Sequence, residues 1–139
     1  MNKAVVRGWL IAALTLIVGC GGGTPATPVA PSPPPPPPTP GPPPLTATVV
    51  IGSNNAFVPA EVTVAVGGRV TFVNQNNRPH DITSDPLHLH TDCPAIIQVG
   101  FIQPGQTKQT GVLEVARVCG FHDHMQENNT DLHGRIIVQ

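Results

Sequence analysis

Short apolar runs rich in β-branched residues recur from residue 45 to the end of the chain. In the run 62–66, valines alternate with Thr63 and Ala65, and the run 69–74 alternates in the same way, which is the period of a strand with one buried face. No run has a convincing helical period. The pattern predicts seven strands, at residues 46–51, 62–66, 69–74, 80–83, 96–102, 108–118 and 134–139.

Turn residues separate these runs. Gly67-Gly68 has the composition of a two-residue hairpin loop, and Pro104-Gly105 marks another turn. Residues 84–95 form a longer irregular passage, and residues 126–133 separate Met125 from the last predicted strand. Seven to eight short strands joined by turns predict an all-β fold, a two-sheet Greek-key sandwich.

The first 44 residues have a different character. Residues 1–19 read as a secretory signal peptide, because Lys3 and Arg7 precede an apolar stretch too short to span a membrane. The residues "IVGC" that end at Cys20 resemble the bacterial lipobox, which implies cleavage before Cys20 and its lipidation. We therefore expect an exported lipoprotein that faces the periplasm or the cell exterior and contacts the membrane through the lipid anchor only.

Residues 20–44 contain the lipidated cysteine and a proline-rich segment that cannot pack a core or form sheet ladders, so we expect a disordered tether. The folded domain is then 45–139. It has five basic side chains against eight acidic ones, which makes nucleic acid an unsuitable partner.

All six histidines lie between His80 and His133. The run "VCGFHDHMQ" alone holds Cys119, His122, His124 and Met125. Side chains of these types are the ligands that copper and other late transition metals take in proteins. The clustering therefore predicts a metal site.

The spacing Cys-x2-His-x2-Met, downstream of His80 on an earlier strand, resembles the cupredoxins, the small blue copper proteins. The resemblance extends over "FVPAEVTVAVGGRVTFVNQNNRPHDI", "PGQT" and "GRIIVQ", nearly the whole folded part. It implies a cupredoxin-like sandwich with one copper ion in a type 1 site, whose ligands are His80, Cys119, His122 and Met125. It also implies an electron carrier rather than an enzyme, with redox proteins as electron donors and acceptors.

Thiol parity supports a different site. With Cys20 lipidated, Cys93 and Cys119 form an even pair in an oxidising compartment, where a disulfide is the usual outcome. Copper would then be held by His80 and His122 with His124 or His90, in a copper-binding or copper-buffering sandwich. The fragment "GFHDH" also resembles part of the copper-zinc superoxide dismutases, but the rest of that ligand set is missing from the sequence.

Overall fold

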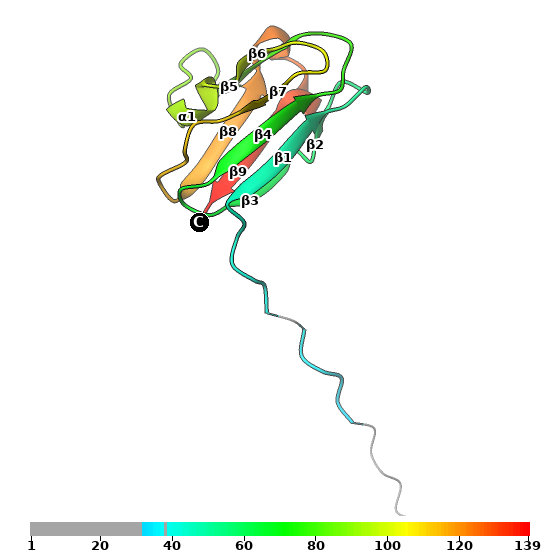
Figure 1. The fold of residues 1–139 in the computed structure, drawn as a ribbon, viewed down its shortest axis with the longest axis vertical. Helices are drawn as coiled ribbons and strands as arrows, with labels where there is room; N and C mark the ends of the chain where they lie inside the picture. The colour runs from blue at the N-terminus through cyan, green and yellow to red at the C-terminus, as the bar shows by residue number, and fades with distance from the viewer. Residues whose placement is uncertain (1–31, 38) are drawn as a thin grey trace, which may run out of the picture. The chain divides into compact units, whose positions relative to one another are not determined.

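The computed structural model describes residues 32–37 and 39–139. These residues form two sheets that pack face to face (Figure 1). One sheet has the order β2 (Phe57–Val58), β1 (Thr46–Ile51), β4 (Arg69–Asn74) and β7 (Thr107–Gln109). The other has the order β3 (Glu61–Val64), β9 (His133–Val138), β8 (Arg117–Asp123), β5 (His80–Ser84) and β6 (Gly100–Ile102). The predicted all-β sandwich is confirmed.

Pairing within the sheets is mixed. β1 runs parallel to β4, and β3 runs parallel to β9. β8 lies between β9 and β5 and is antiparallel to both. β8 is therefore an interior strand whose backbone is fixed on both sides.

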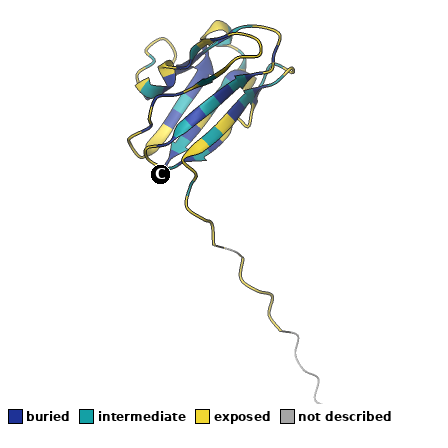
Figure 2. Ribbon diagram, in the orientation of Figure 1, coloured by how far each residue is buried: buried dark blue, intermediate teal, exposed yellow. Residues whose placement is uncertain are grey.

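The core lies between the two sheets and is built from alternate strand positions (Figure 2). Its centre is an aromatic group in which the ring of Phe121 lies 5.1 Å from the rings of both Phe57 and Phe72. Aromatic pairs at such distances add to the free energy of burial. Phe121 belongs to β8, so this packing also fixes one face of that strand.

Short helical turns interrupt the strands. The prediction of a strand over 96–102 was wrong in its first part, because α1 (Pro94–Ile97) occupies it and β6 begins only at Gly100. Proline suits the first turn of a helix, and α1 places Ile96 in the core. Two 3-10 turns, η1 (His124–Gln126) and η2 (Thr130–Leu132), connect β8 to β9.

Two other connections differ from the predictions. Gly67-Gly68 does not close a hairpin, because β3 and β4 belong to different sheets and the turn carries the chain from one to the other. Gly67 has a φ of 87°, which explains the need for glycine. The predicted strand 108–118 is divided into β7 and β8, since residues 110–116 leave one sheet and enter the other.

The predicted signal peptide and the lipidated Cys20 lie outside the described residues. In the proline-rich segment, the described residues 32–37 and 39–44 have no helix or strand. Over residues 32–37 and 39–139, no helix is long and apolar enough to cross a membrane.

Candidate metal centre

β8 presents its side chains alternately to two faces. Cys119 and Phe121 face the core between the sheets, and both are buried. His122 pairs with Thr83 of β5 and His133 of β9, one position out of step with Phe121. Because successive strand residues point to opposite faces, a separation of three residues places the Cys119 and His122 side chains on opposite sides of the sheet.

Cys119 forms a disulfide with Cys93, and the Cα atoms of the two residues lie 5.7 Å apart. The disulfide expected from thiol parity is therefore present. A sulfur in a disulfide is not a thiolate, so the expectation that Cys119 ligates copper was wrong for this structure. The facing of β8 gives a second reason, because Cys119 points away from His122.

His80 and Met125 have other contacts, and His80 is not in the group of potential metal ligands that contains His122 among the described residues. His80 is buried, and its Nδ1 lies 2.8 Å from Oδ2 of Asp123, a residue on the core face of β8. Met125 is 54% exposed in η1, and its backbone N–H donates to Oδ1 of Asp123. With the sulfur of Cys119 in a disulfide, the type 1 ligand set is incomplete in this structure.

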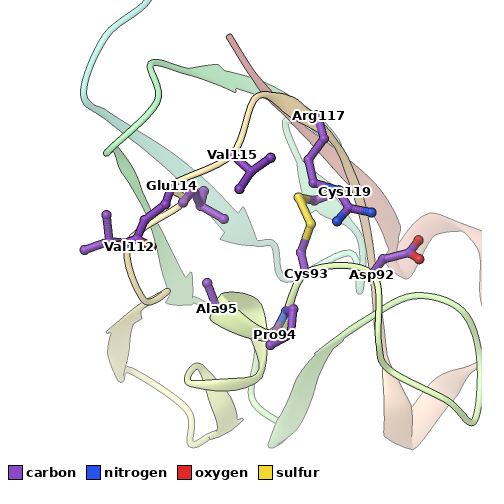
Figure 3. A pocket seen from close by; sticks show the side chains of 10 residues that line it. Asp92, Cys93, Pro94, Ala95, Val112, Glu114, Val115, Arg117 and Cys119 are labelled. Atoms are coloured by element: carbon purple, nitrogen blue, oxygen red, sulfur yellow. A yellow bond between two sulfur atoms is a disulfide. The ribbon is translucent and has the colours of Figure 1, made fainter.

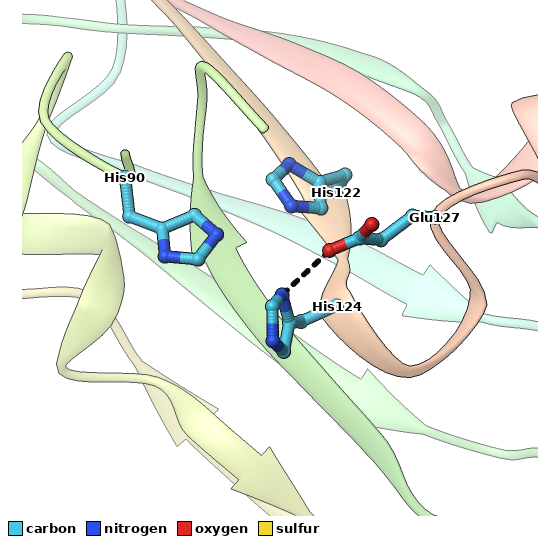
Figure 4. Close-up of side chains that lie close together, drawn as sticks. All are labelled: His90, His122, His124 and Glu127. Atoms are coloured by element: carbon cyan, nitrogen blue, oxygen red, sulfur yellow. Dashed lines mark ion pairs between the residues drawn. The ribbon is translucent and has the colours of Figure 1, made fainter. Parts of the chain in front are cut away.

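A different group meets on the outer face of β8. His90, His122, His124 and Glu127 each offer a ligand atom, and these atoms all lie within 4.8 Å of one another (Figure 4). His90 belongs to residues 85–93, which we call the histidine loop, between β5 and α1. His122 comes from β8, His124 from η1, and Glu127 from the residues that follow. The two histidines named as alternative ligands therefore do lie beside His122.

His122 is held in a fixed orientation. It is buried, and its Nδ1 lies 2.7 Å from Oδ1 of Asp85. Gly120 makes this contact sterically accessible, because a Cβ at that position would lie 2.1 Å from Oδ2 of Asp85. A carboxylate on one ring nitrogen sets the tautomer and turns the other nitrogen toward a metal, an arrangement common in histidine metal sites.

Buried nitrogen atoms at the cluster lack partners. Nε2 of His122 and Nε2 of His90 are shielded from solvent and have no hydrogen-bond partner among the residues described. Buried polar atoms are nearly always paired, so each exception needs an explanation. A bound metal ion would supply one for both nitrogens.

The other members of the cluster are linked to each other. Nδ1 of His124 lies 2.8 Å from Oε1 of Glu127. His133 was not expected at a site. It stacks on His122 with ring centroids 5.7 Å apart, and its Nε2 donates to the backbone oxygen of Glu127. His88 is 75% exposed and lies only at the margin.

The electrostatics favour neutral imidazole at His90. Partial burial lowers the pKa of His90, electrostatic interaction with His124 and His122 lowers it further, and Glu127 acts in the opposite direction. A metal ligand must be deprotonated, so a lowered pKa keeps this nitrogen available in mildly acidic solution.

Asp85, Gly120 and Glu127 were missed in the sequence. The histidines can be recognised in the sequence by their type and their clustering. Asp85 and Glu127 are ordinary surface residue types with no diagnostic spacing. Only the pairing of β5 with β8 shows that Asp85 reaches His122.

The donor set fits copper. Three imidazoles and one carboxylate suit Cu(II), Zn(II) or Ni(II), and Cu(II) binds most strongly to nitrogen and oxygen ligands among the first-row divalent ions. A thiolate is absent from the group. The residues therefore fit a nitrogen-rich copper site.

Solved structures similar to this chain include a purple cupredoxin, plastocyanins and amicyanins. A purple cupredoxin from Nitrosopumilus maritimus superposes with a TM-score of 0.53 at 19% identity, over 67% of this chain and 99% of its own. An oxidised plastocyanin from Dryopteris crassirhizoma superposes with a TM-score of 0.53 at 18% identity, over 67% of this chain and 100% of its own. A reduced amicyanin variant superposes with a TM-score of 0.53 at 18% identity, over 68% of this chain and 82% of its own.

No protein-family model matches the chain. No curated protein matches it either. The structural neighbours nevertheless share its architecture over almost the whole folded part, so the chain has the cupredoxin fold. The resemblance stated from the sequence is confirmed at the level of fold.

Proposed function

We propose that this cupredoxin-fold chain binds one copper ion on the outer face of β8, at the imidazoles of His90, His122 and His124 with the Glu127 carboxylate beside them. The convergence of these four side chains within 4.8 Å is the observation that carries the proposal. The buried and unpartnered Nε2 atoms of His90 and His122 support it.

The cluster suits retention of copper. Copper held there would be a nitrogen-rich Cu(II) centre. Asp85 orients His122, and the stacked ring of His133 limits the movement of the His122 ring. Residues held in this way need little rearrangement to receive a metal ion.

Copper binding or buffering follows from this ligand set more directly than type 1 electron transfer does. A type 1 site needs a cysteine thiolate, and the sulfur of Cys119 is bonded to Cys93. We accordingly propose a binding protein rather than an enzyme. The expectation of redox proteins as partners stays a prediction from the sequence.

The proposed location is outside the cytoplasm. Disulfides persist in oxidising compartments, so the Cys93–Cys119 bond agrees with the signal peptide and lipidation site expected from residues 1–20. In this setting a membrane-anchored protein with a histidine site would hold copper close to the cell surface.

Copper titration of the unreduced chain tests the proposal. We expect one Cu(II) per chain by metal analysis, while intact-mass thiol counting shows Cys93 and Cys119 still oxidised. Zn(II) in equal amount should not displace the copper. Failure to bind Cu(II), or binding only after the disulfide is reduced, would contradict the proposal.

A further inference from the structure

The histidine loop is closed at its base. The N–H of Asp92 donates to the backbone oxygen of Asp85 over 2.8 Å. The N–H of Cys93 donates to Oγ of Ser84 over 2.8 Å. The two ends of the loop therefore leave the sheet side by side.

Within the loop, the backbone is in an unfavourable conformation at both histidines. His88 has a φ of 69° and His90 a φ of 55°, in the left-handed region that non-glycine residues seldom occupy. Such residues persist only where the surrounding structure fixes them, and they gather at functional sites. The N–H of His90 donates to the backbone oxygen of Pro86 over 2.9 Å inside the loop, and a contact with the rest of the domain is what can fix where the loop lies.

The Cys93–Cys119 disulfide is placed to do so. Cys93 ends the histidine loop, three residues after His90, and Cys119 lies in β8, three residues before His122. The bond is on the core face of β8, and the metal-binding side chains are on the outer face. It thus ties the loop that supplies one ligand to the strand that supplies another, without occupying the site itself.

We propose that this disulfide is a positioning element for the candidate metal centre, and that its reduction by a dithiol weakens copper binding by releasing His90. The inference rests on the proposed function. It makes Cys93 and Cys119 positioning residues rather than ligands, the reverse of the role expected for Cys119 from the sequence. Copper retention would then depend on the thiol balance of the compartment.

The disulfide borders a hollow of the structure, which is where a small dithiol would approach it. A hollow of about 200 Å³ has both cysteines in its wall, with Pro94, Ala95 and Val115 as apolar neighbours and Arg117 at its margin (Figure 3). Cys93 and Cys119 are only 5% and 1% exposed, so among the described residues this hollow is the route by which a reductant would approach the disulfide.

A dithiol reduces the Cys93–Cys119 disulfide in two thiol–disulfide exchange steps. One thiolate of the dithiol attacks a sulfur of the bridge, forms a mixed disulfide and releases the other cysteine as thiolate. The second thiol of the reductant attacks the mixed disulfide, releases the remaining cysteine and leaves the reductant oxidised. Two electrons and two protons pass from the dithiol to Cys93 and Cys119.

A double-mutant cycle on the full chain tests the inference. Four proteins are compared, all with Cys20→Ser so that no other thiol binds copper: the parent, Cys93→Ser/Cys119→Ser, His90→Ala, and the combination. We expect the cysteine replacements to weaken Cu(II) binding at least about tenfold in the parent. In the His90→Ala background they should have little further effect, because the ligand they position is already gone.

The outcomes separate this inference from the proposed function. If the parent binds no Cu(II), the proposed function is wrong. If the parent binds and the serine variant binds equally well, or loses the same factor with and without His90, the positioning role is wrong.

A second measurement applies if the serine variant does not fold. Hydrogen exchange of the unmutated chain before and after treatment with dithiothreitol should show loss of protection at residues 84–93 while β3 and β9 stay protected. Unchanged protection at residues 84–93 in the reduced chain would overturn the inference.

Discussion

The residues around His122 hold its ring in one orientation. Asp85 holds one nitrogen, His133 stacks on the ring, and the other nitrogen is left buried without a partner in the described structure. His80 has a similar carboxylate, Asp123, but on the core face of the same sheet. Nε2 of His80 is likewise buried without a partner, but among the described residues only His122 of the two belongs to a group of potential metal ligands.

His124 offers the cleanest single-residue test, since its side chain is 44% exposed and its loss should not disturb the core. We expect His124→Ala to weaken Cu(II) binding by about tenfold or more, because one strong nitrogen ligand is removed. Competition against a chelator of known affinity measures the change. His88→Ala is the matched control, since His88 is exposed and outside the cluster. Equal losses in both variants would contradict the assignment.

The lowered pKa of His90 also predicts how the stability of the metal-free chain varies with pH. A histidine whose folded pKa lies below its unfolded value of 6.5 binds fewer protons when folded, so stability falls as pH drops below about 6.5. Urea unfolding should therefore give a smaller free energy at about pH 5.5 than at about pH 7.5.

His90→Asn is the control for this prediction, because asparagine tolerates the positive φ of 55° but does not titrate. The fall in stability should be smaller in that variant. An equal fall in both proteins would show that other groups cause it.

Among the elements, the bounds of some strands were predictable from the sequence and their pairing partners were not. β1 and β4 begin and end where the sequence places them, at 46–51 and 69–74. The turn at Gly67-Gly68 was recognised, but local sequence could not show that the chain changes sheets there. Pairing depends on contacts between distant residues, which turn chemistry alone does not specify.

The ligand set was also predicted wrongly because of where a strand ends and which way its side chains face. The sequence predicts that the strand ends at residue 118, so that Cys119 and His122 could converge on one metal ion, whereas β8 extends to Asp123 and separates the two side chains by its alternation. The histidine loop was predicted as irregular, but local sequence could not show that the Cys93–Cys119 bond joins its end to β8 or that hydrogen bonds close its base. Residue types predicted a metal site, and the facing of the strand decides which of those residues lie together.

Gly120 provides a test of the contact between β8 and the histidine loop. A Cβ at residue 120 would lie 2.1 Å from Oδ2 of Asp85, so Gly120→Ala should push Asp85 away from His122. We expect Cu(II) affinity to fall by about 10- to 100-fold, the usual effect of losing a carboxylate behind a histidine ligand. Competition titration measures it, with Asp85→Asn for comparison. Unchanged affinity in Gly120→Ala would show that Asp85 is not needed at this place.

For the whole molecule, we propose a folded copper-binding domain that follows a membrane-anchored tether. The fold is shared with plastocyanin, amicyanin and a purple cupredoxin, while the ligand set proposed here differs from the type 1 set expected from the sequence. A cupredoxin sandwich can therefore present histidines on its outer sheet face when a disulfide occupies the cysteine of β8.

The anchor is tested by metabolic labelling of cells with a palmitate analogue. We expect the unmutated chain to incorporate label and to sediment with membranes, and the Cys20→Ala variant to lose both properties, because a lipid chain supplies the membrane affinity. Equal labelling of the two proteins would exclude lipidation at Cys20.

Pulsed EPR together with the visible spectrum of the Cu(II)-loaded, unreduced chain is the most direct test of the central claim, that imidazoles and not a thiolate hold the copper. The account predicts couplings from several imidazole nitrogens, fewer of them in His124→Ala, and only weak visible absorption. An intense visible band from thiolate-to-copper charge transfer, or couplings that survive unchanged in His124→Ala, would contradict it.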